Sequence, residues 1–518
     1  MDLAVAPAAR RTLAALIGPS CYFIVDTMSE SLATVGGTAV VTPRVVKVVN
    51  ERTGKSSAGQ RRNAKLAAVI AEAGWSHAQL AQAVGRVAAE AGNERFVSVG
   101  RSHVSHWVAG STPSGDAPAI LVEAISRRLG RVVTVDEIGL SGPQAPAALD
   151  WSADTLATLA DLGRGNVDIE RRSVLRAAGY SVASLAVPSQ AWWDAMARRG
   201  GQRSARTGRV IGAGDLEAIR EMSHMFTRID QRRGGGHART AVVQYLTSDV
   251  ASALRAAHSS ADIRRGLFST AGELAYLSGW MAFDNAEHAT AQKYFTVAVQ
   301  LAAEADNPPL AGHVLRAMAH QAVDLGHPRQ AVQLAAASLS GPRSTLASPR
   351  ERALLEVVNA RALAADGQGH AAAKALLRAE DNLAAAGAGD DEPGRVFFFG
   401  EASLAHETAC TLRDLGDLVA ATTQFRHSVN TRKAATFTRT HAVTLGYLGA
   451  VQARQGAIDQ ACSTWSTALD VMDGVHSGRT RQTVVDMRAA LSPFRARGIP
   501  AATELDHRAA RYLASAPR

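Results

Sequence analysis

The sequence of 518 residues predicts an all-α protein, and two observations carry that prediction. Apolar residues recur at intervals of three and four along much of the chain, which places them on one face of a helix. Alanine supplies much of the apolar content while aromatic residues make up only 5%, a balance that favours helices packed at close range. We divide the chain into five segments: 1–60, 61–140, 141–190, 191–264 and 265–518.

The first segment, 1–60, is expected to be flexible and basic. Thr53-Gly54-Lys55-Ser56 matches the end of a phosphate-binding loop, but Val49 stands where that loop needs its first glycine. We therefore expect no nucleotide site there.

The second segment, 61–140, predicts a compact helical unit. Its second helix is expected to begin with a capping box formed by Ser76 and Gln79. A short helix follows in which Val104, Trp107 and Val108 share one face, and Gly110 should end it in the left-handed conformation. Such a helix can bury its apolar face and expose the other.

The opposite face of this short helix carries hydrogen-bonding side chains. Arginine, serine and histidine can each bond to a base edge or a phosphate oxygen, as a recognition helix in the major groove requires. The candidate DNA-contacting residues are Arg101, Ser102, His103, Ser105, His106 and Gln79.

Gln79-Leu80-Ala81, Val104-Ser105-His106-Trp107 and Gly110 resemble the xenobiotic-response-element, or phage-repressor-like, helix-turn-helix regulators over roughly residues 61–140. The resemblance implies a double-stranded DNA operator as partner and, with one half-site read per module, a homodimer. The stretch between Ala83 and Arg101 is longer than the tight turn of that fold. The alternative is that this stretch is one more helical hairpin of an all-helical protein.

The third and fourth segments are expected to connect and extend the helical units. We expect a linker with an amphipathic helix from Arg171 to Pro188. Arg171-Arg172 mimics a twin-arginine export signal, but it follows a domain expected to be folded and Arg176 interrupts its apolar run. The glycines 234–236 predict a turn between helices, with an anion site at a helix N-terminus as the alternative.

The fifth segment, 265–518, is repetitive. A turn residue is followed by a small residue after five positions, a large one after nine and a small one after twelve, and a small residue precedes the turn by seven. Alanine replaces the large residue at position 335, and the turn positions are Ala286, Gly326, Gly367, Gly416 and Gly456. Small residues let paired helices approach closely, and the spacing resembles a tetratricopeptide repeat with lengthened helices. The resemblance implies an α-solenoid whose last helices cap it and whose concave face binds a peptide, a protein or a small effector.

Several stretches resemble a larger group, the actinobacterial regulators that join such a helix-turn-helix to a tetratricopeptide-like C-terminal half. They are Trp107 to Gly110, Ser126 to Arg131, Gly234 to Arg239, Gly279 to Ala282 and Ala291 to Phe295, and the resemblance covers most of residues 61–480. It implies control of transcription, in several relatives of development or secondary metabolism.

Enzyme chemistry has little support in the sequence. His103 and His106 lack a third metal ligand nearby, and the chain contains no recognisable catalytic motif or complete phosphate loop. The three cysteines, Cys21, Cys410 and Cys462, are far apart, which favours free thiols in a reducing cytoplasm. The net charge of +9 fits a nucleic-acid partner, and the chain has no apolar run long enough for a membrane span.

From these observations we expect a cytoplasmic DNA-binding transcriptional regulator, not an enzyme, with no cofactor and no metal. The alternative is a tetratricopeptide scaffold or adaptor protein whose helix-turn-helix does not bind DNA. An exported protein would depend on Arg171-Arg172 alone.

Overall fold

The chain is an all-α protein in the parts that the computed structural model describes, as the sequence predicts. The described residues are 62–90, 93–140, 151, 153–167, 180–202, 209–387 and 392–515. Within them, the strands are one parallel pair of two residues each, β1 (Val210–Ile211) and β2 (Ala257–His258). Segment 1–60, Cys21 and Arg171-Arg172 lie outside the described residues.

The N-terminal domain has a hydrophobic core of its own, made of residues between Leu66 and Leu140. Its helices are α2 (Ala64–Glu72), α3 (His77–Glu90), α4 (Glu94–Val97), α5 (Arg101–Val108) and α6 (Ala117–Leu129). The apolar face predicted for α5 is buried in this core, together with apolar residues of α2 and α3.

Helix ends in this domain also follow the sequence. The backbone N–H of Ser76 donates to Oε1 of Gln79 at 2.9 Å, and the N–H of Gln79 donates to Oγ of Ser76 at 3.3 Å. Gly110 has φ 113° after α5, in the left-handed region. The predicted capping box and the glycine stop are both confirmed.

The middle of the chain packs on the first helices of the fifth segment and shares their hydrophobic core. Its elements are α7 (Thr155–Val167), η1 (Val182–Leu185), α9 (Gln190–Gln202), α10 (Ala213–Arg233), α11 (Gly235–Tyr245), the π-helical turn η2 (Leu246–Val250) and α12 (Ala251–Arg255). Glycines 234–236 lie at a turn between α10 and α11, as the sequence predicts.

The amphipathic helix predicted up to Pro188 is wrong over its described part, which contains only the short 3₁₀ helix η1. The backbone of Ser181 is instead bonded to one side chain: its N–H donates to Oε1 of Gln292 at 3.1 Å, and Nε2 of Gln292 donates to its carbonyl at 2.9 Å. Because these groups bind another helix, they are not available for helical hydrogen bonds.

From residue 261 the chain forms consecutive antiparallel pairs of helices, a solenoid-like arrangement. The first helices of the pairs are α13 (Ala261–Asp284), α15 (Pro308–Asp324), α18 (Pro349–Ala365), α20 (Glu401–Asp414), α22 (Thr438–Arg454) and α24 (Gly478–Ala496). The second helices are α14 (His288–Glu304), α16 (Pro328–Ser338), α19 (Gly369–Ala385), α21 (Leu418–Thr431), α23 (Ile458–Val471) and α25 (Pro500–Ser515). The short helices α17 (Pro342–Thr345) and η3 (Gly394–Val396) lie between pairs.

The five turn positions chosen from the sequence all lie between the two helices of a pair and have positive φ. Gly326, Gly367, Gly416 and Gly456 have φ between 77° and 89°, and Ala286 has φ 61° although it carries a side chain. A sixth pair, α24 and α25, turns at Gly498 in the same way, with φ 74°. The predicted end cap is therefore another helical pair.

The predicted close approach at small residues is present in the first and fifth pairs. A Cβ atom at Gly279 would lie 2.7 Å from Cδ1 of Phe295, and one at Gly449 would lie 2.4 Å from Nε1 of Trp465. The indole N–H of Trp465 also donates to the carbonyl of Gly446 at 3.0 Å. Each large side chain thus lies flat against a glycine of the partner helix.

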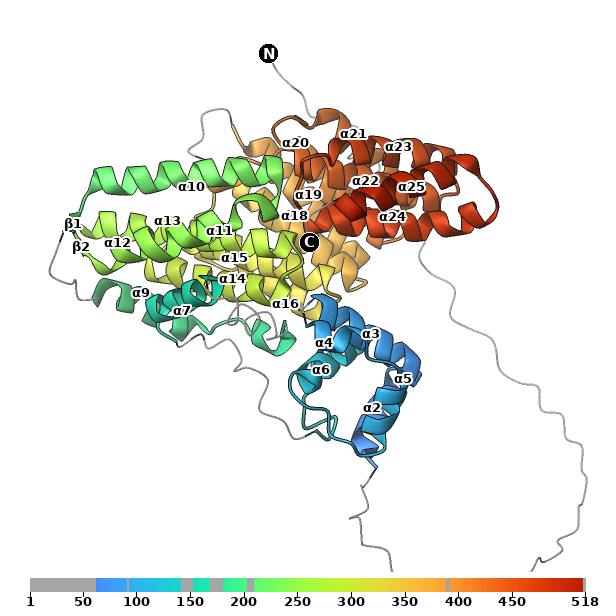
Figure 1. Ribbon diagram of the computed structural model, residues 1–518. Helices are drawn as coiled ribbons and strands as arrows, with labels where there is room; N and C mark the ends of the chain where they lie inside the picture. The colour runs from blue at the N-terminus through green and yellow to red at the C-terminus, as the bar shows by residue number, and fades with distance from the viewer. Residues whose placement is uncertain are drawn as a thin grey trace, which may run out of the picture.

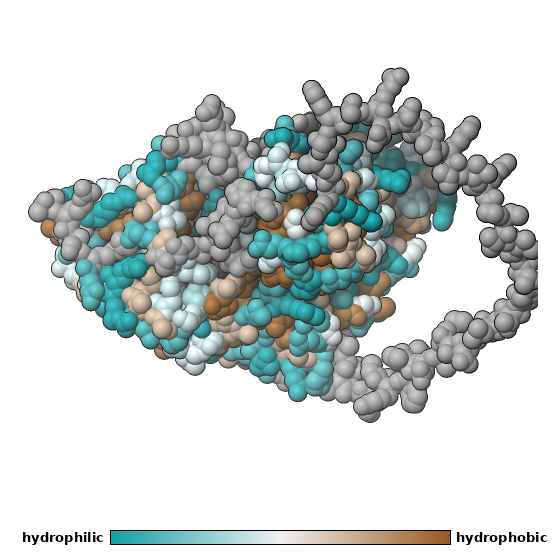
Figure 2. Space-filling model, turned by 90° about the horizontal axis from the view of Figure 1, so that it is seen from below, coloured by the Kyte–Doolittle hydropathy of each residue, from teal (hydrophilic) through white to brown (hydrophobic). Residues whose placement is uncertain are grey.

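Figure 1 shows the paired helices as an elongated array, with the N-terminal domain below it near α16. The face seen from below in Figure 2 is largely hydrophilic, with small separated hydrophobic areas. Exposed large hydrophobic residues come from different elements, among them Val97, Leu346 and Val419. No helix in the described ranges has the length and apolar character to cross a membrane.

Gly449→Ala should lower the stability of the C-terminal pairs by roughly 1–3 kcal/mol, because the added methyl group overlaps the indole of Trp465. The matched control is Gly201→Ala on α9, where a Cβ atom meets nothing within 4 Å and alanine favours the helix. Thermal unfolding followed by circular dichroism measures both. Equal melting temperatures for Gly449→Ala and the parent would contradict the close packing.

Candidate functional site

The first candidate site is the exposed face of α5. Val104, Trp107 and Val108 anchor the helix in the N-terminal core, while the side chains of Arg101, Ser102, His103 and His106 are exposed. Among the described residues, the side chains of Arg101, Ser102 and His106 have no hydrogen-bond partner. These three groups are free to contact a ligand.

The other candidate residues also bond within the domain. Oγ of Ser105 lies 3.0 Å from Nδ1 of His77 on α3 and donates to the carbonyl of Arg101 at 3.0 Å. Nδ1 of His103 accepts from the backbone N–H of Gly100 at 3.1 Å, which caps α5. The amide oxygen of Gln79 is used in the capping box of α3. The Ser105–His77 contact thus joins α5 to α3, while His103 and Gln79 cap their own helices.

The long connection between α3 and α5 contains an extra helical turn. This turn, α4, buries Phe96 in the domain core. α3 passes close behind it, because a Cβ atom at Gly85 would lie 2.9 Å from the carbonyl oxygen of Val97. The residues that exceed a tight turn therefore form a packed element between the two helices.

Some of the positively charged side chains of the N-terminal domain are held in ion pairs and others are not. Residues 62–140 contain eight Arg and Lys against seven Asp and Glu. On α6, Arg127 pairs with Glu90 at 2.6 Å and with Glu123 at 2.9 Å. Arg131, just after α6, pairs with Glu72 and Glu137. Arg128, also on α6, donates instead to the backbone carbonyl of Ala73 at 3.0 Å. The other described cations without a carboxylate partner lie on or near α2, α3, α4 and α5.

The second notable feature is the contact between the N-terminal domain and the helical pairs. Nε2 of His327, in the turn between α15 and α16, lies 2.8 Å from Oε1 of Glu123 on α6, and both side chains are buried. The ring of Tyr180 stacks on the imidazole with centroids 5.8 Å apart. Burial opposes ionisation of Glu123, but His327 and Arg127 outweigh it and hold the pKa of that carboxyl below its usual value.

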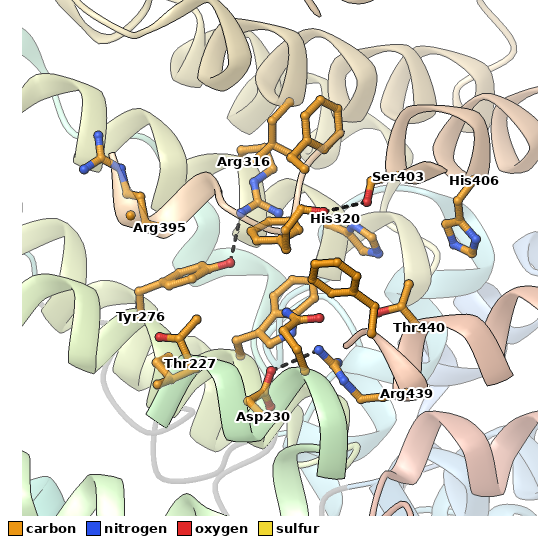
Figure 3. Close-up of a pocket in the computed structure, with 18 of the residues that line it drawn as sticks. Thr227, Asp230, Tyr276, Arg316, His320, Arg395, Ser403, His406, Arg439 and Thr440 are labelled. Atoms are coloured by element: carbon orange, nitrogen blue, oxygen red, sulfur yellow. Dashed lines mark hydrogen bonds and ion pairs between the residues drawn. The ribbon is translucent and has the colours of Figure 1, made fainter. Parts of the chain in front are cut away.

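The third feature is a central cavity with about 1110 Å³ of empty space, part of it continuous with solvent. Its wall is built mainly from the first helices of the pairs, α13, α15, α18, α20, α22 and α24, and from α10. Figure 3 shows Tyr276, Arg316 and Arg439 reaching into this space from three different helices. None of the second helices contributes a lining residue.

Buried ion pairs connect the elements of the cavity wall. Arg439 on α22 lies 3.0 Å from Asp230 on α10 and 2.9 Å from Asp284 on α13. Burial raises the pKa of Asp230 to about 6 although Arg439 acts against it. The backbone N–H of Gly235, at the start of α11, also donates to Asp284 at 3.0 Å. The protein's own carboxylate therefore occupies the anion site considered for the glycine run.

A second buried pair joins α18 to η3. Arg395 contacts both carboxylate oxygens of Glu351 at 2.7 and 2.8 Å and reaches Glu273 at 3.2 Å. Burial would raise the pKa of Glu351, but Arg395 and His313 bring it down to about 2. Glu351 is therefore ionised at neutral pH and forms an ion pair with Arg395.

The buried histidines of the wall are neutral. Burial, followed by Arg361 and Arg479, lowers the pKa of His320 well below its usual value, and both arginines lie within 3.0 Å of its Nε2. Burial likewise lowers the pKa of His406. Nearby, burial raises the pKa of the free thiol Cys410 to about 12. At neutral pH such imidazoles are not acids, and a thiol that stays protonated is not a ready nucleophile.

The described residues hold no cluster of three or more metal-binding side chains. The exposed α5 residues were predicted from the sequence, whereas the cavity residues were not. A signal was present on α15, where Arg316 and His320 lie in a largely apolar helix whose residues 310–322 are all buried. Arginine is rarely fully buried in a protein unless it is paired with another group.

His327→Ala should loosen the N-terminal domain from the helical pairs, because it removes a buried partner of Glu123. We expect a loss of roughly 1–3 kcal/mol, measured as faster hydrogen–deuterium exchange in α6. His427→Ala is the matched control, since the His427–Glu401 pair is exposed and worth little. Unchanged exchange in α6 of His327→Ala would show that this contact does not hold the domain.

Comparison with known proteins gives one family match: residues 66–141 match the SP15 N-terminal domain. No curated protein and no solved structure matches the chain. The match coincides with the separately packed N-terminal core, so the chain carries an SP15 N-terminal domain in a largely helical protein.

Proposed function

We propose that the protein is a DNA-binding transcriptional regulator, with α3 and α5 as a helix-turn-helix and α5 as the recognition helix. The observation that carries the proposal is the two-sided character of α5. Its apolar side is buried while Arg101, Ser102 and His106 are exposed without internal partners. Guanidinium, hydroxyl and imidazole groups can bond to base edges and phosphates.

Other features support the arrangement of such a regulator. A single module reads one half-site, so the active species is proposed to be a homodimer in the cytoplasm. The helical pairs, which resemble tetratricopeptide repeats in spacing, are proposed to sense an effector in the central cavity. α15 contributes to the cavity wall, and three residues after its end His327 contacts the N-terminal domain. An effector that changes α15 could thereby change the state of the DNA-binding domain.

A second candidate is a scaffold or adaptor protein whose N-terminal domain contacts only protein. The near balance of charge in residues 62–140 favours it, because Arg127 on α6 and Arg131 just after it are already paired with carboxylates. Modules that bind DNA usually keep a basic face for the phosphates. Binding to duplex DNA separates the two candidates.

Arg101→Ala should weaken binding of the full chain to a selected DNA duplex by roughly 1–3 kcal/mol, because it removes one charged contact to a base or phosphate. Fluorescence anisotropy of labelled duplex over a salt series measures the affinity. Arg426→Ala is the control, since Arg426 is exposed on α21, far along the chain from the N-terminal domain. If the parent and Arg101→Ala bind the duplex with equal affinity, α5 is not the recognition helix.

A further inference from the structure

Two of the arginines that line the central cavity have no carboxylate partner. Arg395, Arg439 and Arg479 each pair with at least one carboxylate. Arg316 and Arg432 lie within 4.0 Å of no carboxylate oxygen of a described residue. An unpaired buried charge is costly for a protein to keep.

Arg316 is only 2% exposed, and its contacts are to neutral groups. Its Nη2 donates to the hydroxyl of Tyr276 at 3.0 Å and to Nε2 of His313 at 3.0 Å, while its buried Nε has no partner. Burial and then Arg316 lower the pKa of His313 to about 3, so this imidazole is a neutral acceptor. The Tyr276–Arg316 bond is drawn in Figure 3.

Arg432 repeats this situation at another part of the wall. It is 7% exposed, and its Nη2 donates to the carbonyl of Ala402 at 2.8 Å and to Oγ of Ser428 at 3.1 Å. Its buried Nε also has no partner. Burial lowers the pKa of Arg432 to about 10, which shows how little its charge is compensated. The carboxylate that acts on it, Glu407, is itself paired with Arg361 at 3.1 Å.

Apolar and aromatic side chains complete the wall. The guanidinium of Arg316 lies 5.8 Å from the ring centroid of Tyr276 and 5.7 Å from that of Trp280. Phe398 and Phe437 line the same cavity. Such a wall suits a ligand with a planar or apolar body and one charged group.

We propose that the central cavity binds a small organic anion, with its carboxylate or phosphate group at Arg316 and its apolar body against the aromatic side chains beside it. The anion supplies the countercharge that Arg316 lacks, and the charge of Arg432 elsewhere on the wall adds to the attraction. The inference that this anion is the effector rests on the proposed function. The inference that the cavity binds an anion can be tested without DNA.

The probes are 2-naphthoate and 2-naphthyl phosphate, with 2-naphthamide as the neutral control of the same shape. Isothermal titration calorimetry of the full chain should show binding of at least one anion and markedly weaker binding of the amide. The two anions distinguish a carboxylate ligand from a phosphate ligand. Absence of binding by both anions, or equal affinity for the amide, would overturn the proposal.

Arg316→Gln should weaken anion binding by roughly 10- to 100-fold, the value of a charged hydrogen bond. Arg432→Gln should weaken it less, because Arg432 lies at another part of the wall. Arg426→Gln is the matched control, because Arg426 lies on α21, six positions before Arg432, and is exposed with the neutral partner Gln460. Equal loss in this control, or none in Arg316→Gln, would contradict the assignment.

Arg316→Met separates a ligand contact from a structural role. Without ligand, its melting temperature should equal or exceed that of the parent, because an uncompensated charge has been removed. It should also lose anion binding. A lower melting temperature together with unchanged anion binding would make Arg316 a structural residue and overturn the proposal. If anions bind but DNA affinity does not respond to them, the proposed regulatory function fails and the anion site stands.

Discussion

The guanidinium of Arg439 holds together parts of the chain that the repeat architecture alone would leave apart. In a solenoid each pair of helices contacts mainly its neighbours. Here α22, in the fifth pair, is tied to Asp230 on α10 and Asp284 on α13, which are 209 and 155 residues earlier in the sequence. Because all three side chains are buried, breaking one contact would leave an unpaired charge. This connection closes the array around the central cavity.

A chain of contacts connects the wall of the cavity to the N-terminal domain. Asp324, at the end of α15, pairs with Arg361 at 3.1 Å and with Arg479 at 3.3 Å, both of which also contact His320 of the wall. Three residues later His327 reaches Glu123 of the N-terminal domain. Asp324 lies eight residues after Arg316, which is about 12 Å along the helix. A ligand at Arg316 would therefore act on a rigid element that ends at the domain contact.

The sequence predicted those parts of the fold that depend on local chemistry. Spacing and side-chain size can be read directly from the sequence. They predict the turn positions from Ala286 to Gly456, the small residues opposite Phe295 and Trp465, and the buried face of α5. The 3₁₀ turn η1 was missed because Gln292, more than a hundred residues away, binds its backbone. The cavity arginines were missed for the same reason, since their pairing depends on which distant helices meet.

In vitro selection of duplexes from a random DNA library, with the purified full chain, tests the central claim most directly. We predict a selected pool that shares an inverted repeat, with half-sites centred about 10 base pairs or a multiple of this apart, as a dimeric helix-turn-helix requires. A pool that stays random after repeated rounds would contradict the account and favour an N-terminal domain that contacts protein.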